Sequence, residues 1–304
     1  MIAPAFHEQL SQYPANAVAI LNNLKNQQGR LDPDQLQKLM VCLDLSWEPL
    51  LKTLLTLAAS LSTNPVSRFA VGAIVEGYRE HGHGPLYFGA NLEMAGHPLK
   101  YAIHAEQAAV CNAWHQGETR IRRLIVNETP CGHCRQFLNE LNEVDKTEFI
   151  VSHIGSEKKS AYGISDLLPD SFGPADLGQE DRLLSSTPVK IELPSQLIED
   201  ELAVAAARAA SASYAPYSGC NSGIALRLKD GRIITGRYAA NAAFNPGMPA
   251  IESALVNWRL ANLTATETEL TDAVLVEKND VISHKAMTEA VLADHGIRLR
   301  YIAV

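Results

Sequence analysis

The feature that most constrains the fold of this chain is a series of short matches between its two halves. The tripeptide Ala-Ala-Ser at 58–60 returns at 209–211, and Gly72 returns at the same offset as Gly223. Two further matches follow in the same order after a shorter loop: Gly89 with Gly236, and residues 104–110 with 249–255. Because the matches keep their order, they indicate an internal duplication, and we expect two similar domains.

The first copy alternates between two kinds of apolar segment. Short runs rich in Val, Ile and Phe predict strands, and longer runs with helical spacing predict helices. The predicted strands are 69–77, 86–93, 122–128 and 149–154, and the predicted helices are 104–114 and 134–141. Such alternation indicates an α/β fold in which helices pack on a sheet.

Two further stretches indicate the domain boundaries. Residues 1–48 favour helices, because Asp32 and Pro33 form a helix-start signal and apolar residues follow at helical spacing. Residues 170–195 are rich in Ser, Pro, Gly and Asp and predict a linker. We therefore expect three domains: a helical N-terminal domain at 1–48, the first copy at 49–185, and the second copy at 186–304.

Composition and charge disfavour several classes of function. Hydrophobic residues make up 46% of the 304-residue chain, which is enough for folded cores. No apolar run reaches the ~18 residues of a membrane span, and the first residues lack the pattern of a signal peptide, so we expect a cytoplasmic protein with no membrane partner. The net charge of −8 disfavours a nucleic-acid partner. Five cysteines, an odd number, favour thiols and metal ligands over a disulfide framework.

Four residues able to carry chemistry lie where helices of the first copy are expected to begin: His104, Glu106, Cys131 and Cys134. In the second copy Pro249 replaces the histidine, Ile251 replaces the glutamate, and residues 274–287 contain no cysteine. A neighbouring polar pair changes as well: Asn91 to Tyr238 and Glu93 to Ala240. Residues that differ between two copies of one framework are not required by that framework, so a chemical role is favoured for the first set.

The three ligand-type residues fit a catalytic zinc site. Zinc prefers Cys and His ligands in a tetrahedral shell, and catalytic sites leave one of the four places to water. His104, Cys131 and Cys134 supply three ligands, and Cys111 is unsuited as a fourth because it lies two helical turns, about 10 Å, beyond the histidine. Glu106, two residues after the histidine, is placed to move protons between the water and a substrate nitrogen.

Several longer segments, together with these residues, match a known family. The spacing H-x-E followed by P-C-x-x-C is the signature of zinc deaminases. Further matching segments are SRFAVGAIVEG, YFGANLE, IHAEQAA, VNETPCGHCRQFLNEL, LLPDSFGPADL and NAAFNP. Over nearly its whole length the chain resembles the long, homodimeric cytidine deaminases of bacteria. The resemblance implies a small helical N-terminal domain, a catalytic three-layer α/β/α domain, and a second domain of the same fold that lacks the metal site.

The resemblance also implies roles for individual residues. One Zn²⁺ per chain is held by His104, Cys131 and Cys134, and Glu106 contacts ring N3 and the leaving amino group. The nucleoside substrate is contacted through Phe69 at the base, Asn91 and Glu93 at the ribose, and the backbone of Ala105 and Cys131 at the polar edge of the base. In this family the partner subunit completes each active site, and Phe172 and residues 242–244 resemble the borrowed pieces.

The implied reaction is hydrolytic and belongs to pyrimidine salvage. Water activated by zinc adds at C4 of cytosine, Glu106 moves two protons, and ammonia leaves. Cytidine or deoxycytidine is thereby converted to uridine or deoxyuridine.

Other functions stay open beside this one. A related zinc deaminase would act on a nucleotide, a purine base or a polynucleotide. The carboxylate of Glu93 beside the ribose disfavours a phosphate, and the acidic net charge disfavours a polynucleotide. A zinc-stabilised binding protein is a third function, and the intact Glu106 disfavours it.

Each of these residues, taken singly, also fits a purely structural role. His104 alone fits a satisfied core histidine, and the Cys-x-x-Cys pair fits a redox motif or half of a zinc knuckle. Phe69 fits core packing, Asn91 fits a turn, and Glu93 fits a solvated strand end. We expect His81 and His83 in a solvated loop, His133 as a loop side chain turned away, and Cys42, Cys111 and Cys220 as small buried hydrophobes.

Overall fold

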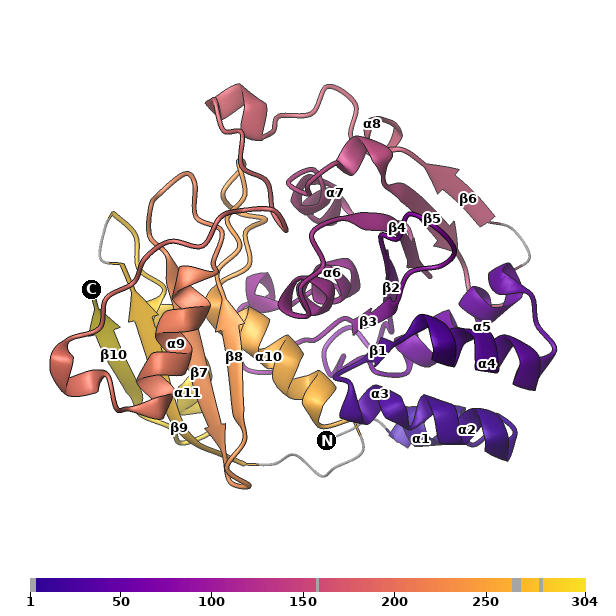
Figure 1. The fold of residues 1–304 in the computed structure, drawn as a ribbon, viewed down its shortest axis with the longest axis horizontal. Coiled ribbons are helices and arrows are strands. Elements are labelled where there is room, and N and C mark those ends of the chain that lie inside the picture. The colour runs from indigo at the N-terminus through magenta and orange to yellow at the C-terminus, as the bar shows by residue number, and fades with distance from the viewer. Residues whose placement is uncertain (1–3, 157–158, 264–268, 279–280) are drawn as a thin grey trace. The chain divides into compact units, whose positions relative to one another are not determined.

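The computed structural model describes residues 4–156, 159–263, 269–278 and 281–304, and the chain divides into two compact units (Figure 1). The first unit is Met1–Ser171 with Arg259–Thr266, and the second is Phe172–Trp258 with Glu267–Val304. Each unit contains one sheet with helices packed on it, which confirms the predicted α/β class. Among the helices that the structure describes, none is long and apolar enough to cross a membrane.

The N-terminal segment is helical, as predicted. Its helices are α1 (Pro4–Leu10), α2 (Ala15–Leu21), α3 (Asn23–Asn26) and α4 (Pro33–Leu43). α4 begins at the predicted signal, because the backbone N–H of Asp32 donates to Gln35 Oε1 at 2.7 Å and proline takes the first helical position. Between α3 and α4, the strand β1 (Arg30–Leu31) pairs antiparallel with β3, and the sequence does not predict it. Two residues carry no periodicity that indicates a strand.

The sheet of the first unit has the strand order β1-β3-β2-β4-β5-β6. The predicted strands are confirmed as β2 (Gly72–Gly77), β3 (Leu86–Ala90), β4 (Ile121–Val126) and β5 (Glu148–Ser152). β2 pairs antiparallel with β3 and β4, and β4 pairs parallel with β5. The edge strand β6 (Lys159–Tyr162) and the short helix α8 (Ile164–Leu167) have no counterpart among the predicted elements.

Two helices, α5 (Trp47–Ala59) and α6 (Ala105–His115), cover opposite faces of this sheet (Figure 1). A side chain at Gly72 would lie 2.2 Å from a backbone nitrogen of α5, and one at Gly89 would lie 2.2 Å from a backbone nitrogen of α6. Gly89 pairs with Ala73, the residue after Gly72, and successive residues of a strand face opposite ways. The two glycines therefore let the helices pack closely on either face, which gives the expected three layers.

The second unit repeats this arrangement in a sheet of strand order β10-β9-β7-β8. Its strands are β7 (Ser222–Leu228), β8 (Ile233–Arg237), β9 (Leu270–Glu277) and β10 (Leu299–Ala303), and its helices are α9 (Glu201–Ser211), α10 (Ala250–Ala261) and α11 (Lys285–Ala293). β7 pairs antiparallel with β8 and β9, and β9 pairs parallel with β10. Side chains at Gly223 and Gly236 would lie 2.1 Å from backbone atoms of α9 and α10. The duplication is thus confirmed.

The backbone around the candidate site pairs in the same way in both copies. Ile103, the residue before the histidine, forms an isolated bridge with Leu92. Met248, the residue before Pro249, forms the same kind of bridge with Ala239. The structure therefore gives Pro249 the place in the second copy that the histidine has in the first.

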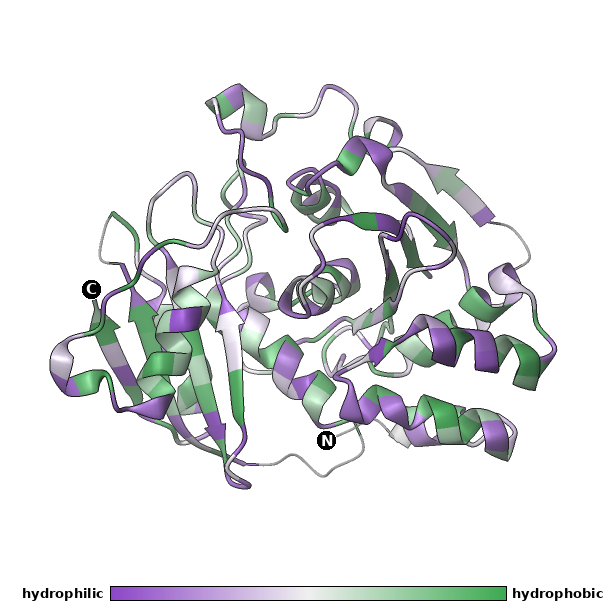
Figure 2. Cartoon of the chain, viewed as in Figure 1, coloured by the Kyte–Doolittle hydropathy of each residue, from purple (hydrophilic) through white to green (hydrophobic). Residues whose placement is uncertain are grey.

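Burial fixes the position of the helix that begins at the candidate site. Apolar residues run along the strands of both sheets and along the helix faces that pack on them (Figure 2). β2 is buried along its whole length, and α6 is buried at every residue from Ala105 to Trp114. A helix enclosed on all sides has no freedom to slide or rotate, so its first residues are held in place.

Replacing Gly89 by Ala should destabilise the protein by about 3 kcal/mol or more, because the new methyl group overlaps backbone atoms of α6. Gly163→Ala is the matched control, since its methyl group would meet no described atom closer than Asp166 Oδ2 at 3.5 Å. The midpoints of urea denaturation of the two variants and the parent measure the effect. Similar midpoints for both variants would contradict the close packing of α6 on β3.

Candidate metal centre and active site

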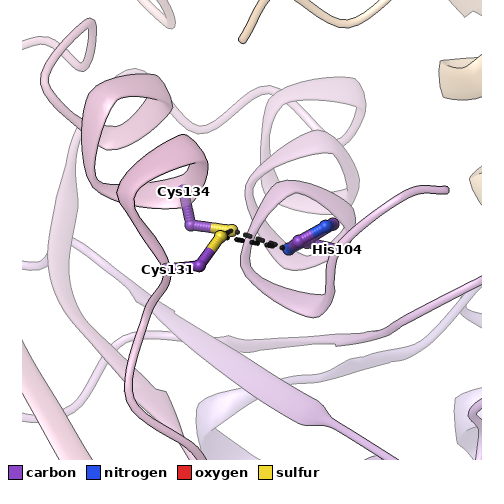
Figure 3. Close-up of side chains that lie close together, drawn as sticks. All are labelled: His104, Cys131 and Cys134. Atoms are coloured by element: carbon purple, nitrogen blue, oxygen red, sulfur yellow. Dashed lines mark hydrogen bonds between the residues drawn. The ribbon is translucent and has the colours of Figure 1, made fainter. Parts of the chain in front are cut away.

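Two helix starts bring three ligand-type side chains together (Figure 3). His104 is the N-cap residue of α6, Cys131 is the N-cap residue of α7 (Gly132–Leu138), and Cys134 lies in the first turn of α7. Both sulfur atoms lie next to the imidazole ring in Figure 3. The first N–H groups of a helix lack intrahelical partners, and the positive end of the helix dipole favours negatively charged groups there. The start of α7 therefore suits the thiolates of Cys131 and Cys134.

The distances between the donor atoms match a tetrahedral zinc site. His104 Nδ1 lies 3.5 Å from Cys131 Sγ and 3.3 Å from Cys134 Sγ, and the two sulfur atoms are 3.8 Å apart. Zinc bonds of ~2.3 Å to sulfur and ~2.0 Å to nitrogen give tetrahedral edges of about 3.5 Å for S–N and about 3.8 Å for S–S. The geometry and the chemistry of these donors therefore fit zinc with three protein ligands.

Hydrogen bonds within this group favour a thiolate at its exposed end. Hydrogen bonds with Cys134 and His104 lower the pKa of Cys131 to about 3. The hydrogen bond with Cys131 raises the pKa of His104, and the same sulfur together with burial raises the pKa of the Cys134 thiol. Negative charge is thus already present on one sulfur, where a cation would neutralise it.

Glu106 lies in the first turn of α6, and only 4% of it is exposed. Burial raises the pKa of its carboxyl group, so it exchanges protons closer to neutral pH than an exposed glutamate does. The residue lines a cavity of about 280 Å³ together with His104. The other predicted residues that line this cavity are Phe69, Asn91, Glu93, Ala105 and Cys131.

Asn91 holds the loop that carries Phe69. Its Oδ1 accepts the N–H of Val71 at 2.8 Å and the hydroxyl of Ser62 at 2.6 Å, and its Nδ2 donates to the carbonyl of Phe69 at 3.0 Å. The amide is therefore not a simple turn residue, because it links three points of one loop to the end of β3. Phe69 itself is 53% exposed, which disfavours a role in core packing.

Glu93 fixes the beginning of the same loop. Its Oε2 accepts the N–H groups of Val66 and Ser67, each at 2.9 Å. Burial alone raises the pKa of Glu93, but the hydrogen bonds from Ser67 and Val66 outweigh it, and the pKa is lowered. An ionised carboxylate therefore lines the cavity at neutral pH.

The backbone between these anchors is strained. Arg68, directly before Phe69, has φ of 57°, in the left-handed region that side-chain-bearing residues avoid. Gly219 has the corresponding place in the second copy, with φ of 67° and no steric strain. The first copy, which lines the cavity, thus has a strained residue where the second copy has a glycine. Such backbone strain is typical of functional loops.

Comparisons with known proteins agree with this geometry. Residues 45–151 and 164–289 each match a family model described as the cytidine and deoxycytidylate deaminase zinc-binding region. The chain is 43% identical over 293 residues to the cytidine deaminase of Photobacterium profundum. The match covers 95% of this chain and 94% of that protein. The chain belongs to the cytidine deaminase family.

Other cytidine deaminases match different shares of the chain. The cytidine deaminase of Haemophilus influenzae is 41% identical over 301 residues, or 97% of each chain. Among solved structures, the cytidine deaminase of Mycobacterium tuberculosis is 30% identical and covers 42% of this chain and 99% of that one, with a TM-score of 0.35.

Two further residues at the candidate site follow β4 directly, and the sequence analysis does not single them out. Asn127 Oδ1 accepts the N–H of Gly72 at 2.7 Å, and its Nδ2 donates to the carbonyl of Ala70 at 3.2 Å. Glu128 lines the cavity. The sequence could have indicated them only by their position between a predicted strand and the cysteine motif, because polar side chains at the end of a strand reach the edge of the sheet.

Two histidines have contacts that the sequence does not show. His83 lies in the predicted loop with 37% of its side chain exposed, but its Nδ1 also lies 3.3 Å from Glu76 Oε1 and its ring stacks on Trp47 with centroids 3.5 Å apart. His133 lies in α7 rather than in a loop, with its ring centre 5.5 Å from that of His104. Contacts between residues far apart in the chain leave no local pattern from which to predict them.

Replacing Cys134 by Ser should remove one zinc ion per chain, because a neutral hydroxyl is a much weaker zinc ligand than a thiolate. Cys42→Ser, a change in α4 outside the ligand group, should leave the zinc content unaltered. Elemental analysis of both purified variants measures the difference. Full zinc content in a folded Cys134→Ser variant would contradict the ligand role.

Proposed function

We propose that this chain hydrolyses cytidine and deoxycytidine to uridine and deoxyuridine, with release of ammonia. The observation that carries the proposal is the meeting of three zinc-type ligands beside the buried carboxyl group of Glu106 in one cavity. Relatives named cytidine deaminase that match this chain over most of its length support the choice of substrate. A binding protein would have no need of a buried acid with a raised pKa at that place.

In this proposal His104, Cys131 and Cys134 would hold one Zn²⁺, which when bound would lower the pKa of water and so supply a nucleophile near neutral pH. Glu106 would take up the two protons of the attacking water in turn, passing the first to N3 of cytosine and the second to the departing amino group, which leaves as ammonia. Its burial serves this role, because a carboxyl group with a raised pKa both accepts and returns a proton.

The walls of the cavity would select a nucleoside. Phe69 packs against the pyrimidine, and the backbone of Ala105 and the N–H of Cys131 contact its polar edge. Asn91 and Glu93 would form hydrogen bonds with a ribose hydroxyl, and the carboxylate of Glu93 would repel a phosphate. Asn91 contributes mainly by holding the loop of Phe69 in place.

The chain would work as a homodimer in which the partner subunit completes each cavity. Phe172 and the segment 242–244 are the proposed contributions to the partner. The support is the family likeness and the exposure of aromatic rings, 46% for Phe172 and 71% for Phe244. Exposed aromatic side chains are typical of protein interfaces.

The place in the cell and the division into domains form part of the same proposal. None of the five cysteines is in a disulfide bond, as is usual in the reducing cytoplasm, where pyrimidine salvage would use the enzyme. The domains would be the helical segment 1–48, the catalytic domain 49–185, and the deaminase-like domain 186–304, which lacks the metal site of the first copy. Neither a nucleic acid nor a membrane is a proposed partner.

Zinc-loaded protein should convert cytidine to uridine, seen as a loss of cytidine absorbance and confirmed by chromatography. Glu106→Gln should lower kcat by about 10³-fold or more, because an amide moves no protons, while zinc content and fold are retained. Glu80→Gln, a surface change outside the cavity, is the control. Turnover by Glu106→Gln at the parent rate would contradict the proton-transfer role.

Cytidine 5′-monophosphate should react with a kcat/KM at least about tenfold below that of cytidine, because the Glu93 carboxylate disfavours a second negative charge. Glu93→Gln should narrow this ratio and raise KM for cytidine. Steady-state rates with both substrates measure the ratio in each protein. Equal kcat/KM values for nucleoside and nucleotide in the parent enzyme would overturn the nucleoside preference.

A further inference from the structure

A second group of metal-ligand side chains lies in the second unit, where the proposed function uses none of them. A sulfur of Cys220, a carboxylate oxygen of Glu277 and an imidazole nitrogen of His284 lie within 4.8 Å of one another. Cys220 is fully buried, Glu277 is 1% exposed, and the His284 side chain is 11% exposed. The expectation of a plain buried hydrophobe at Cys220 therefore misses these neighbours.

The residues of this group stand at different positions of the duplicated framework from those of the first ligand set. Cys220, just before β7, stands at the offset of Phe69 in the first copy. Glu277 is the last residue of β9, and His284 is the N-cap residue of α11. In the first copy the N-cap residue of the corresponding helix, α7, is Cys131. The second copy thus lacks the first ligand set but has three ligand-type residues around an equivalent helix start.

Hydrogen bonds already hold Glu277 and His284 together and tie Cys220 to the backbone of the segment between them. Glu277 Oε1 accepts the backbone N–H of His284 at 2.8 Å and lies 2.8 Å from His284 Nδ1. Its Oε2 accepts the hydroxyl of Ser283 at 2.8 Å. Cys220 Sγ donates to the carbonyl of Ile282 at 3.3 Å. The carboxylate is oriented by three of these contacts, which is the kind of support that ligands of a metal need.

The donor types select one class of ion. Thiolate and imidazole donors favour zinc and similar transition metals, whereas magnesium and calcium take oxygen ligands. One thiolate and one carboxylate balance the two positive charges of such an ion, so it enters a buried site without leaving net charge. Three protein ligands leave the fourth tetrahedral place to water.

We propose that Cys220, Glu277 and His284 form a second, zinc-class metal site in this chain, in contrast to the single Zn²⁺ per chain that the family resemblance implies. Binding releases the thiol proton of Cys220, and the His284 proton moves from Nδ1 to Nε2. Tetrahedral zinc would set Nδ1 and the carboxylate oxygen about 3.4 Å apart, so the pair opens by about 0.6 Å from its present 2.8 Å. The ion joins the segment before β7 to the end of β9 and the start of α11.

Zinc counting in the full-length protein tests the proposal. The protein is saturated with Zn²⁺, freed of excess by gel filtration, and assayed for zinc and for chain concentration. We expect two zinc ions per chain in the parent and in Cys42→Ser, and one in Cys220→Ala and in Glu277→Gln. Because the count does not depend on turnover, failure of the proposed deamination leaves this test intact.

Two results would overturn the proposal. One is a single zinc ion per chain in the parent at saturation, which would leave the group as a hydrogen-bonded cluster only. The other is two zinc ions in a folded Cys220→Ala variant, which would put the second ion elsewhere. Where that variant does not fold, stepwise addition of Co²⁺ to the parent decides. A sulfur-to-cobalt charge-transfer band in both steps supports the site, and its absence from one step refutes it.

Discussion

The close contact of α6 with β3 is the constraint on which the candidate site depends. At Gly89 the absence of a side chain lets the helix lie against the strand, and full burial then fixes where the helix begins. β4, which is separated from β3 by β2, leads within a few residues into α7, so Cys131 and Cys134 reach the same place from the other side of β2. A displacement of about 1 Å between the two helix starts would lengthen donor distances that now match a zinc tetrahedron.

The duplication separates the framework from the chemistry within one chain. Both copies share the order of their central strands, the glycine contacts and the isolated bridges, yet only the first has the His-Cys-Cys set and the buried glutamate. The framework therefore does not require the first ligand set, which favours a chemical role for it. The second copy instead brings Cys220, Glu277 and His284 together at other positions of the same framework.

The sequence predicts most of the framework and the chemical residues of the first copy, because both depend on local patterns. Strands and helices follow from periodicity, and the duplication identifies His104 and Glu106 by their loss from the second copy. Other features depend on contacts between distant segments. The two-residue strand β1, the stack of His83 on Trp47, and the hydrogen bonds by which Asn91 holds its loop have no local signal. The structure is needed to find them.

Cytidine deamination should depend on zinc in protein first stripped of metal by a chelator. We expect the stripped protein to be inactive and the rate of uridine formation to rise with added zinc to a plateau. Magnesium should not restore it, because the site offers two sulfur atoms and one nitrogen. Full activity before zinc is added, or zinc bound at His104, Cys131 and Cys134 without turnover of cytidine, would contradict the account.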